Sequence, residues 1–235
     1  MPDMNGDNSL EFWDRYAREH WERKQGREQT RLFALYFLEV VDLPLRSGSL
    51  LDMGCAMGDA VVEFHQRCPN LAYTGMDPVP YFIEKAREAY GSIASFKIGG
   101  FDDLAETYDI IYCSNTLEHF SNYLEIAQKL LSHCRWLYVM GPYKEMRHGR
   151  HLSLQNPADQ HVVTFTKQSF SELLPDPCAA KRHWIRRTPI AWDDGPAPVR
   201  RAVALRRSLR YLLFDTAPRQ IILELCARQQ PTKEA

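Results

Sequence analysis

A turn containing two glycines follows a short apolar segment and has the composition of a ligand-binding loop. It reads Asp52-Met53-Gly54-Cys55-Ala56-Met57-Gly58. Glycine adopts positive φ and lets a ligand approach the backbone closely, and the Asp52 carboxylate could bind a cationic amine directly or through water. Ala56 stands where the dinucleotide fingerprint G-x-G-x-x-G has its second glycine, and no G-K-[ST] of a phosphate loop follows. A tight turn without a ligand is the alternative.

A second carboxylate, Asp77, precedes Pro78 at the end of the next apolar segment. An acidic residue roughly 20 residues beyond such a glycine turn accepts hydrogen bonds from ribose hydroxyls in open α/β folds. An Asp-Pro pair after a strand can also form a turn that only caps a helix. Because the two features come in this order, we favour a ligand site.

A histidine, His119, follows a later apolar run and is a candidate catalytic base. Its unperturbed pKa lies near neutrality, so it could accept a proton from a hydroxyl; a packed, hydrogen-bonded histidine is the alternative. A polar loop further along could bind a phosphate or carboxylate through its basic groups, unless it is only solvated. The candidate residues of this loop are Tyr143, Arg147, His148 and His151.

The elements that must position these residues alternate between strand and helix. Apolar runs predict strands at 49–53, 71–76, 94–98, 108–114 and 135–140, and helical spacing predicts helices at 60–67, 80–90 and 123–132. Such alternation indicates a parallel sheet with helices on both faces. Ligands of open α/β sheets bind beyond the carboxyl ends of the strands, which is where the residues above would meet.

The segments on either side of this alternating core complete the predicted secondary structure. Residues 9–41 are expected to be helical, with Gly26 separating two helices. Downstream we expect a helix at 167–174, a strand at 179–190, a basic amphipathic helix at 199–214 and a last strand at 219–227.

Charge and composition restrict the class of protein. Lys and Arg total 29 and Asp and Glu 30, so there is no overall basic field to attract nucleic acid. The N-terminal residues lack the apolar core of a signal peptide, and no apolar run approaches the roughly 20 residues that span a bilayer. The six cysteines form no C-x-x-C pair. We therefore expect a cytoplasmic protein without a transmembrane segment.

Four segments in order resemble class I S-adenosylmethionine-dependent methyltransferases of the small-molecule type: residues 51–58, 75–78, 99–104 and 108–120. The resemblance implies a Rossmann-like, doubly wound, mostly parallel seven-stranded sheet with helices on both faces. It implies one domain over residues 1–235, in which 1–44 form a helical cap, 143–166 a substrate loop and 191–217 an insertion before the last strand.

The resemblance also implies a binding site for S-adenosyl-L-methionine. In the family the glycine turn wraps the methionine moiety, the acid of the second strand holds the ribose, and residues after the third strand frame the adenine. Here Gly100 stands where the family often has an Asp, and Ala56 replaces a glycine whose loss is usually tolerated. The expected cofactor-binding residues are Tyr16, Asp52, Gly54, Cys55, Gly58, Asp77, Pro78, Phe101, Asp102, Ser114 and Asn115.

The expected activity is methylation of a small molecule, which could be anionic, at a hydroxyl of a sugar, glycan or secondary-metabolite building block. His119 would be catalytic, and His161 would join the loop residues in binding the acceptor. Some relatives bind a divalent metal through two Glu and a His, but Asn115 replaces the first Glu, so we expect no metal. An RNA or protein methyltransferase, using helix 199–214 as a contact surface, and a catalytically silent cofactor-binding partner subunit are the alternatives. The oligomeric state stays open.

Overall fold

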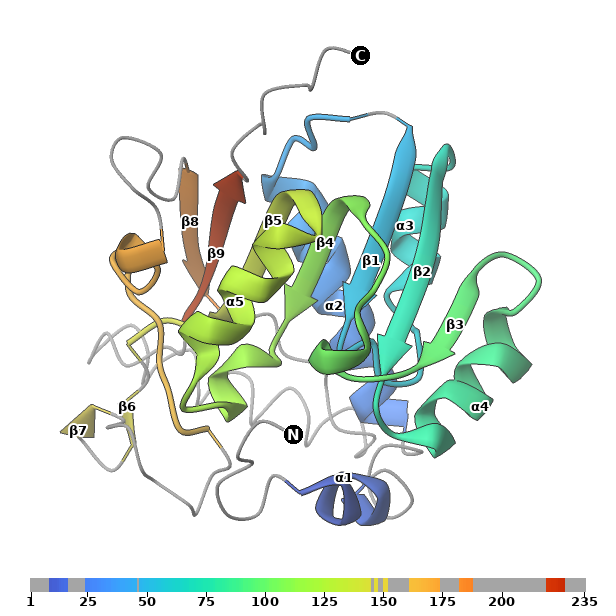
Figure 1. Ribbon diagram of the computed structural model, residues 1–235, viewed down its shortest axis with the longest axis horizontal. Helices are drawn as coiled ribbons and strands as arrows, with labels where there is room; N and C mark the ends of the chain where they lie inside the picture. The colour runs from blue at the N-terminus through green and yellow to red at the C-terminus, as the bar shows by residue number, and fades with distance from the viewer. Residues whose placement is uncertain are drawn as a thin grey trace, which may run out of the picture.

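A seven-stranded sheet forms the centre of the protein in the computed structural model (Figure 1). The structure describes residues 9–16, 24–45, 47–144, 146–147, 150–151, 161–173, 182–187 and 219–226. The sheet is composed of β1 Gly48–Met53, β2 Leu71–Asp77, β3 Ser95–Ile98, β4 Tyr108–Ser114, β5 Cys134–Pro142, β8 Arg182–Arg187 and β9 Arg219–Cys226.

The strand order is β3-β2-β1-β4-β5-β9-β8. Neighbouring strands from β3 to β5 are parallel, whereas β9 runs antiparallel to β5, and β8 antiparallel to β9. The expectation of a mostly parallel, seven-stranded sheet is therefore confirmed. The order reverses at β1 and β4, so the carboxyl ends of these two strands flank the crevice in which this class of fold binds ligands.

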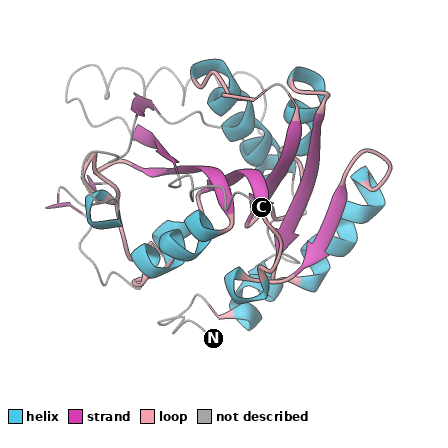
Figure 2. Cartoon of the chain, turned by 45° about the horizontal axis from the view of Figure 1, so that its top comes forward, coloured by secondary structure: helices cyan, strands magenta, loops and turns pink. Residues whose placement is uncertain are grey.

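Helices cover both faces of the sheet (Figure 2). The helices α2 Lys24–Val40, α3 Val61–Arg67 and α4 Pro80–Tyr90 pack on one face, and α5 Tyr123–Ser132 packs on the other. Consecutive strand residues such as Leu50 and Leu51 point to opposite faces and are both fully buried. This explains why the central strands are continuous apolar runs rather than alternating ones.

Short elements gather at the carboxyl ends of the parallel strands. The helix α1 Leu10–Tyr16 lies beyond these ends (Figure 1). The 3-10 turns η2 Phe101–Asp103 and η3 Leu117–His119 follow β3 and β4. Further along, β6 Met146–Arg147 pairs antiparallel with β7 Arg150–His151, and a third 3-10 turn, η5, spans Ser171–Leu173.

Two secondary-structure predictions were wrong. Gly26 lies inside α2 instead of separating two helices, since one glycine costs only about 1 kcal/mol relative to alanine in a helix. Residues 167–170 form turns before η5 instead of an α-helix. There the Ser169 hydroxyl accepts the Thr166 N–H at 2.7 Å, and the Thr166 hydroxyl accepts the Gln168 N–H at 3.2 Å. Such local side-chain bonds compete with helical hydrogen bonds.

Other predictions were confirmed only in part, or fall on residues that the structure does not describe. The two-stranded pair β6–β7 lies within the expected substrate loop, where no strand was predicted. The expected strand at 179–190 is described as the shorter β8. The basic helix 199–214 and the insertion 191–217 lie outside the described residues.

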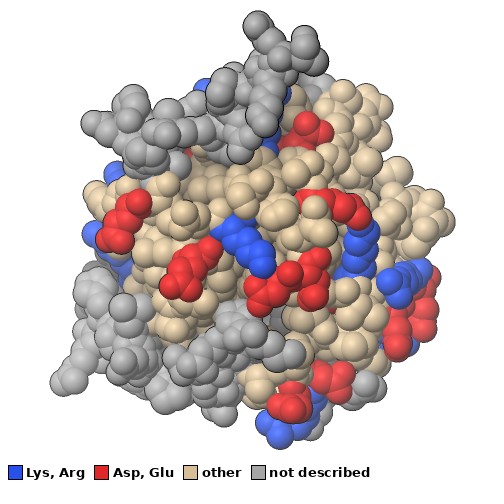
Figure 3. All heavy atoms as spheres, in the orientation of Figure 1, with Lys and Arg blue, Asp and Glu red and all other residues tan. Residues whose placement is uncertain are grey.

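Acidic and basic side chains are interspersed over the described part of the face seen in Figure 3. Among the helices that the structure describes, none combines the length and the apolar character needed to cross a membrane.

Candidate cofactor and acceptor site

The glycine turn joins β1 to α3 and requires its glycines. Gly54 has φ +80° and Gly58 has φ +75°, both in the left-handed region. A Cβ on Gly54 would collide with the Thr116 side chain, and one on Gly58 would lie 2.5 Å from Cε1 of Phe96. The turn is therefore closely packed between the segment that follows β4 and the side chain of a β3 residue.

Ala56 also adopts a left-handed conformation, with φ +47°. This costs a non-glycine residue about 1–2 kcal/mol. Its N–H donates to Oδ2 of Asp77 at 3.0 Å, and its methyl group is buried. The residue that replaces the family's glycine is thus strained, and the hydrogen bond that it donates to Asp77 of the next strand holds it in place.

Backbone hydrogen bonds tie the turn to the end of β2. The N–H groups of Gly54 and Cys55 both donate to the Met76 carbonyl, at 2.8 and 3.2 Å. The Cys55 side chain is buried on the sheet side, and this burial raises the pKa of its thiol well above the ordinary value. Cys55 can therefore offer a ligand only its backbone.

Two buried carboxylates, Asp52 and Asp77, lie at the ends of adjacent strands. The Tyr73 hydroxyl donates to Asp52, while Asp77 accepts the N–H groups of Ala56 and Val79, each at 3.0 Å. Burial raises the pKa of Asp52 to about 7 and that of Asp77 to about 6. A cationic ligand would stabilise the ionised form of both groups.

In the loop after β3 the aromatic residue is buried, whereas an acidic residue lies at the surface. Phe101 is buried, with its ring centroid 5.2 Å from that of Phe120 in an edge-to-face contact. The Asp102 carboxylate, one of the expected cofactor-binding residues, lies at the surface and pairs with Nζ of Lys129 at 2.8 Å. Asp103 closes its own turn by accepting the Gly100 N–H at 2.8 Å. Of these three residues, Phe101 is the one whose side chain is buried.

The segment after β4 lies against the glycine turn. Asn115 has φ +50°, and its N–H donates to the Met140 carbonyl at 2.8 Å, while its side-chain amide donates to Oγ of Ser114 at 3.0 Å. Thr116, next in the chain, faces Gly54. Ser114 and Asn115 thus belong to a segment that packs on the turn through Thr116.

Three side chains that the sequence had not grouped come together beyond this segment: Glu118, His119 and His161. One ligand atom from each lies within 4.8 Å of the others. The ring centroids of His119 and His161 are 5.0 Å apart, with an interplanar angle of 64°. The carbonyl of Glu118 accepts the N–H groups of Val162 and Val163 at 2.8 and 3.1 Å, which holds the 161–163 segment against η3.

Trp13 of α1 connects these histidines with the glycine turn. Its ring lies 5.1 Å from that of His119, edge to face, and it packs on the cluster formed by Ala56, Met57, Val79 and Phe82.

Tyr143 is half-buried and forms an isolated bridge with Phe165.

The remaining predicted site residues are described less fully. The backbones of Tyr16, Arg147 and His151 belong to α1, β6 and β7, but their side chains are outside the described part, and His148 lies outside the described residues altogether. Pro78 is adjacent to the loop after β3, because a Cβ on Gly100 would lie 3.9 Å from the Pro78 Cβ.

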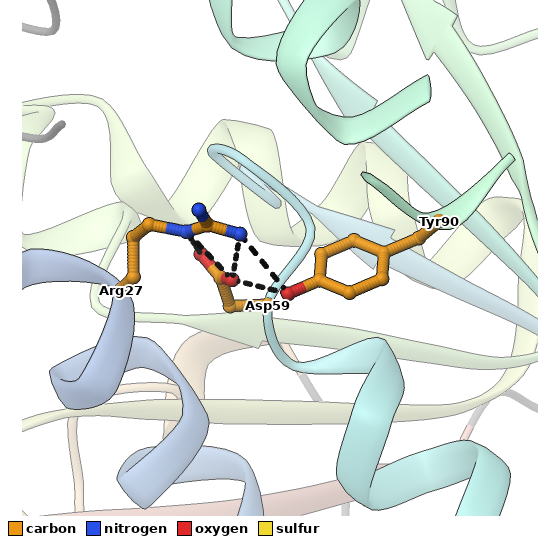
Figure 4. A network of polar contacts seen from close by, with 3 residues as sticks. All are labelled: Arg27, Asp59 and Tyr90. Atoms are coloured by element: carbon orange, nitrogen blue, oxygen red, sulfur yellow. Dashed lines mark hydrogen bonds and ion pairs between the residues drawn. The ribbon is translucent and has the colours of Figure 1, made fainter. Parts of the chain in front are cut away.

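A polar network behind the turn was not foreseen from the sequence (Figure 4). Asp59 directly follows Gly58 and is buried, and it accepts hydrogen bonds from Nε of Arg27 at 3.0 Å and from the Tyr90 hydroxyl at 2.6 Å. These partners come from α2 and from the last residue of α4. An acid directly after the last glycine was the only sequence signal, and it did not identify the partners.

A hollow of about 350 Å³ lies elsewhere in the molecule. It is lined by residues including Pro44, Trp136 and Glu224. Trp136 belongs to the start of β5 and Glu224 to the end of the antiparallel β9, so the hollow lies at the amino ends of the parallel strands. It is therefore distinct from the site built on the glycine turn.

Comparison with known proteins agrees with this geometry. Residues 21–176, more than half of the chain, match a family model described as "Methyltransferase domain". No curated protein matches the chain.

Solved structures share the fold at low sequence identity. The plantazolicin methyltransferase BpumL in complex with SAH is 18% identical, with 92% of this chain and 89% of that chain covered and a TM-score of 0.52. Coclaurine N-methyltransferase bound to N-methylheliamine and SAH is 15% identical, with coverages of 83% and 71% and a TM-score of 0.58. A putative methyltransferase in complex with the Haloferax volcanii Trm112 methyltransferase activator is 16% identical, with coverages of 92% and 98% and a TM-score of 0.60. The family match and the strand order together show that the chain belongs to the methyltransferase domain family and is an S-adenosylmethionine-dependent methyltransferase of class I.

Proposed function

We propose that this methyltransferase methylates a hydroxyl of a small molecule, and that His119 assists the loss of the hydroxyl proton. The observation that carries the proposal is the grouping of His119 with His161 and Glu118 beside Trp13. Methyl transfer from a sulfonium depends mainly on alignment of the nucleophile with the methyl carbon. A protonated hydroxyl also needs help in losing its proton, and imidazole groups beside the cofactor turn supply that help.

The cofactor is held, in this proposal, by the ends of the first four strands. Asp52 faces the cationic amine of the methionine moiety, and the backbone from Gly54 to Gly58 surrounds that moiety. Each Asp77 oxygen accepts one backbone N–H and keeps a lone pair for a ribose hydroxyl. The adenine lies against Phe101, and the segment Ser114–Asn115 lines the cofactor on the acceptor side.

The acceptor is a sugar, a glycan or a secondary-metabolite building block with a free hydroxyl. Trp13 and Tyr143 offer aromatic surface to its ring or apolar part, and Arg147, His148 and His151 form a basic segment that suits an acidic group. The names of two structural neighbours refer to small molecules, namely plantazolicin and N-methylheliamine.

Calorimetry followed by an acceptor screen tests the proposal. We expect the purified chain to bind S-adenosylmethionine and to release S-adenosylhomocysteine with hydroxyl-bearing small molecules. His119→Ala should lower turnover between about a hundredfold and about ten-thousandfold and leave cofactor binding intact. His65→Ala, which changes an exposed histidine of α3, is the control and should have no effect. Turnover with only amine or RNA acceptors would refute the proposal.

A further inference from the structure

The cluster Glu118–His119–His161 has the composition of a metal site. It offers one carboxylate oxygen and two imidazole nitrogens, which lie within 4.8 Å of one another. Two His and one carboxylate are the protein ligands of several catalytic metal centres, in which the remaining coordination positions are open to water or substrate.

The backbone holds these ligands in a fixed arrangement. Glu118 and His119 are consecutive in the turn η3, and His161 is brought to them because the Glu118 carbonyl accepts two N–H groups from residues 162 and 163. The imidazole rings meet at 64° instead of stacking, so their edges can face a common point. Ligands that are fixed before the ion arrives avoid the entropy cost of ordering them.

The burial of the cluster is asymmetric. Glu118 has 0% relative exposure, whereas both histidines are half-buried. A carboxylate in such a position is stabilised by a cation. The two imidazoles are partly exposed, so the cluster is not sealed from solvent, although Trp13 packs on one side of the His119 ring. A Cβ at Gly141 of β5 would come within 3.6 Å of the Glu118 carboxylate, so that strand passes close behind it.

We propose that Glu118, His119 and His161 bind one divalent transition-metal ion, which in turn binds the oxygen of the methyl acceptor. The two nitrogen ligands favour Zn²⁺ or Fe²⁺ over Mg²⁺, which prefers an all-oxygen site. The open positions suit an acceptor whose hydroxyl neighbours a second oxygen donor, such as a vicinal diol or an α-hydroxy acid. The resemblance to metal-binding relatives had argued against a metal, because Asn115 replaces their first Glu, but a third ligand is available here from His161, which lies in a separate segment.

The catalytic role of the ion rests on the proposed function. In this role, His119 acts by holding the ion. The ion polarises the acceptor oxygen as a Lewis acid. The O–H bond breaks and the proton passes to solvent. An oxygen lone pair then forms the O–CH₃ bond, while the electron pair of the C–S bond stays on sulfur and converts the sulfonium into the thioether of S-adenosylhomocysteine. His119 thus assists the loss of the proton by holding the ion that polarises the O–H bond, while the proton itself passes to solvent.

A binding experiment on the full chain tests the site without relying on turnover. Protein stripped with a chelator is titrated with Co²⁺, whose visible absorption reports nitrogen and oxygen ligation, and then with Zn²⁺ and Mg²⁺. We expect one equivalent of Co²⁺ or Zn²⁺ to bind, and weaker binding of Mg²⁺. His161→Ala should lower the affinity at least tenfold, since even changes to outer-sphere partners cost about 10–100-fold, and His65→Ala should bind as the unmodified protein does.

The variants are chosen so that either result is informative. Glu118→Gln changes a fully buried residue, so its folding is checked by circular dichroism. The half-buried His161→Ala decides the question if Glu118→Gln does not fold. Failure of the unmodified chain to bind Co²⁺ and Zn²⁺, or unchanged binding by His161→Ala, would overturn the inference. Cofactor binding and turnover of the stripped protein are measured in parallel. Methylation of a hydroxyl without metal would leave the proposed function standing. Metal binding without any cofactor binding would count against the proposed function alone.

Discussion

Asp52 is a carboxylate in surroundings that disfavour its charge. It is buried next to Asp77, and burial is the largest cause that raises its pKa to about 7, while the hydrogen bond from Tyr73 opposes the shift. The hydroxyl of Tyr112 on β4 is a further titratable group near it. Because the pKa is raised in the folded state, protonated Asp52 stabilises the fold at low pH. That contribution is lost as the pH rises through about 7.

Cofactor affinity should therefore depend on pH through Asp52. A cationic amine binds the ionised carboxylate, so binding releases a proton below the pKa of about 7. We expect the affinity for S-adenosylmethionine to rise with pH across neutrality, by up to about tenfold per pH unit on the acidic side. Calorimetry in buffers of different ionisation enthalpy measures both the affinity and the proton release.

Asp52→Asn is the matched variant for this pH dependence. It removes the titrating group but keeps the size of the side chain, so its affinity should be lower and should vary little around neutrality. An unmodified protein whose affinity is flat from about pH 6 to about pH 8 would contradict the assignment of Asp52 to the cationic amine.

At the scale of elements, the helix α2 is linked to the cofactor turn through Arg27. The guanidinium contacts both oxygens of Asp59, and Tyr90 at the end of α4 donates to the same carboxylate (Figure 4). A second ion pair joins Arg31 of α2 to Glu63 of α3 at 2.5 Å. The glycine turn is thus held from behind by helices that are distant in the sequence.

Removal of the Arg27 link should loosen the turn. Arg27→Ala leaves the buried Asp59 carboxylate with the Tyr90 hydroxyl but without its cation, and should cost about 1–2 kcal/mol in the free energy of unfolding. This loss of unfolding free energy is smaller than for a fully buried ion pair, because the Arg27 side chain is 41% exposed and solvent screens its charge. Urea denaturation followed by circular dichroism measures this loss, and we also expect weaker cofactor binding.

The control for Arg27 is a pair of the same charge type that lies at the surface. Lys85 and Glu88 are 2.9 Å apart with side chains 38% and 67% exposed. Such pairs contribute at most about 0.5 kcal/mol, so Lys85→Ala should unfold at nearly the same urea concentration as the unmodified protein. Equal effects of the two substitutions would show that Arg27 does not stabilise the turn.

Elements whose formation depends on local patterns were predictable from the sequence. The strand at 108–114 and the helix at 123–132 have the predicted bounds, because one is a continuous apolar run and the other has a clear helical period. The glycine turn and Asp77 were located for the same reason, since each directly follows such a strand.

Contacts between distant segments were not predictable. The approach of His161 to His119 depends on two backbone hydrogen bonds that no residue type specifies. Asp102 precedes β4 in the sequence, whereas its partner Lys129 follows β4. The sequence around an exposed acidic residue does not indicate which basic residue it will pair with. The positions of the glycine turn and of Asp77 were thus predictable from local patterns, whereas the meeting of His119 with His161 was not.

For the molecule as a whole, the cofactor residues proposed above come from the ends of β1, β2, β3 and β4. The same strands form the middle of the hydrophobic core on both faces of the sheet. A ligand that contacts all four strand ends must lose its site when the sheet unfolds, so its binding free energy adds to the stability of the entire domain.

Thermal unfolding tests this coupling. At a free concentration of about one hundred times Kd, S-adenosylhomocysteine should add about 2.7 kcal/mol, which corresponds to a rise in Tm of about 5–10 °C for a domain of 235 residues. Differential scanning calorimetry should show one transition that moves as a unit. Two transitions, of which only one moves with ligand, would contradict a single cooperative domain.

The attachment of residues 162–163 to the Glu118 carbonyl has a consequence for how this enzyme can diversify. Both hydrogen bonds join backbone atoms, so they specify no amino acid at either valine position. The sequence between Lys144 and His161 can therefore drift, lengthen or be exchanged for that of a relative while its return point stays beside η3. An enzyme arranged in this way can acquire new acceptors over evolutionary time without rebuilding the half of the molecule that holds the methyl donor.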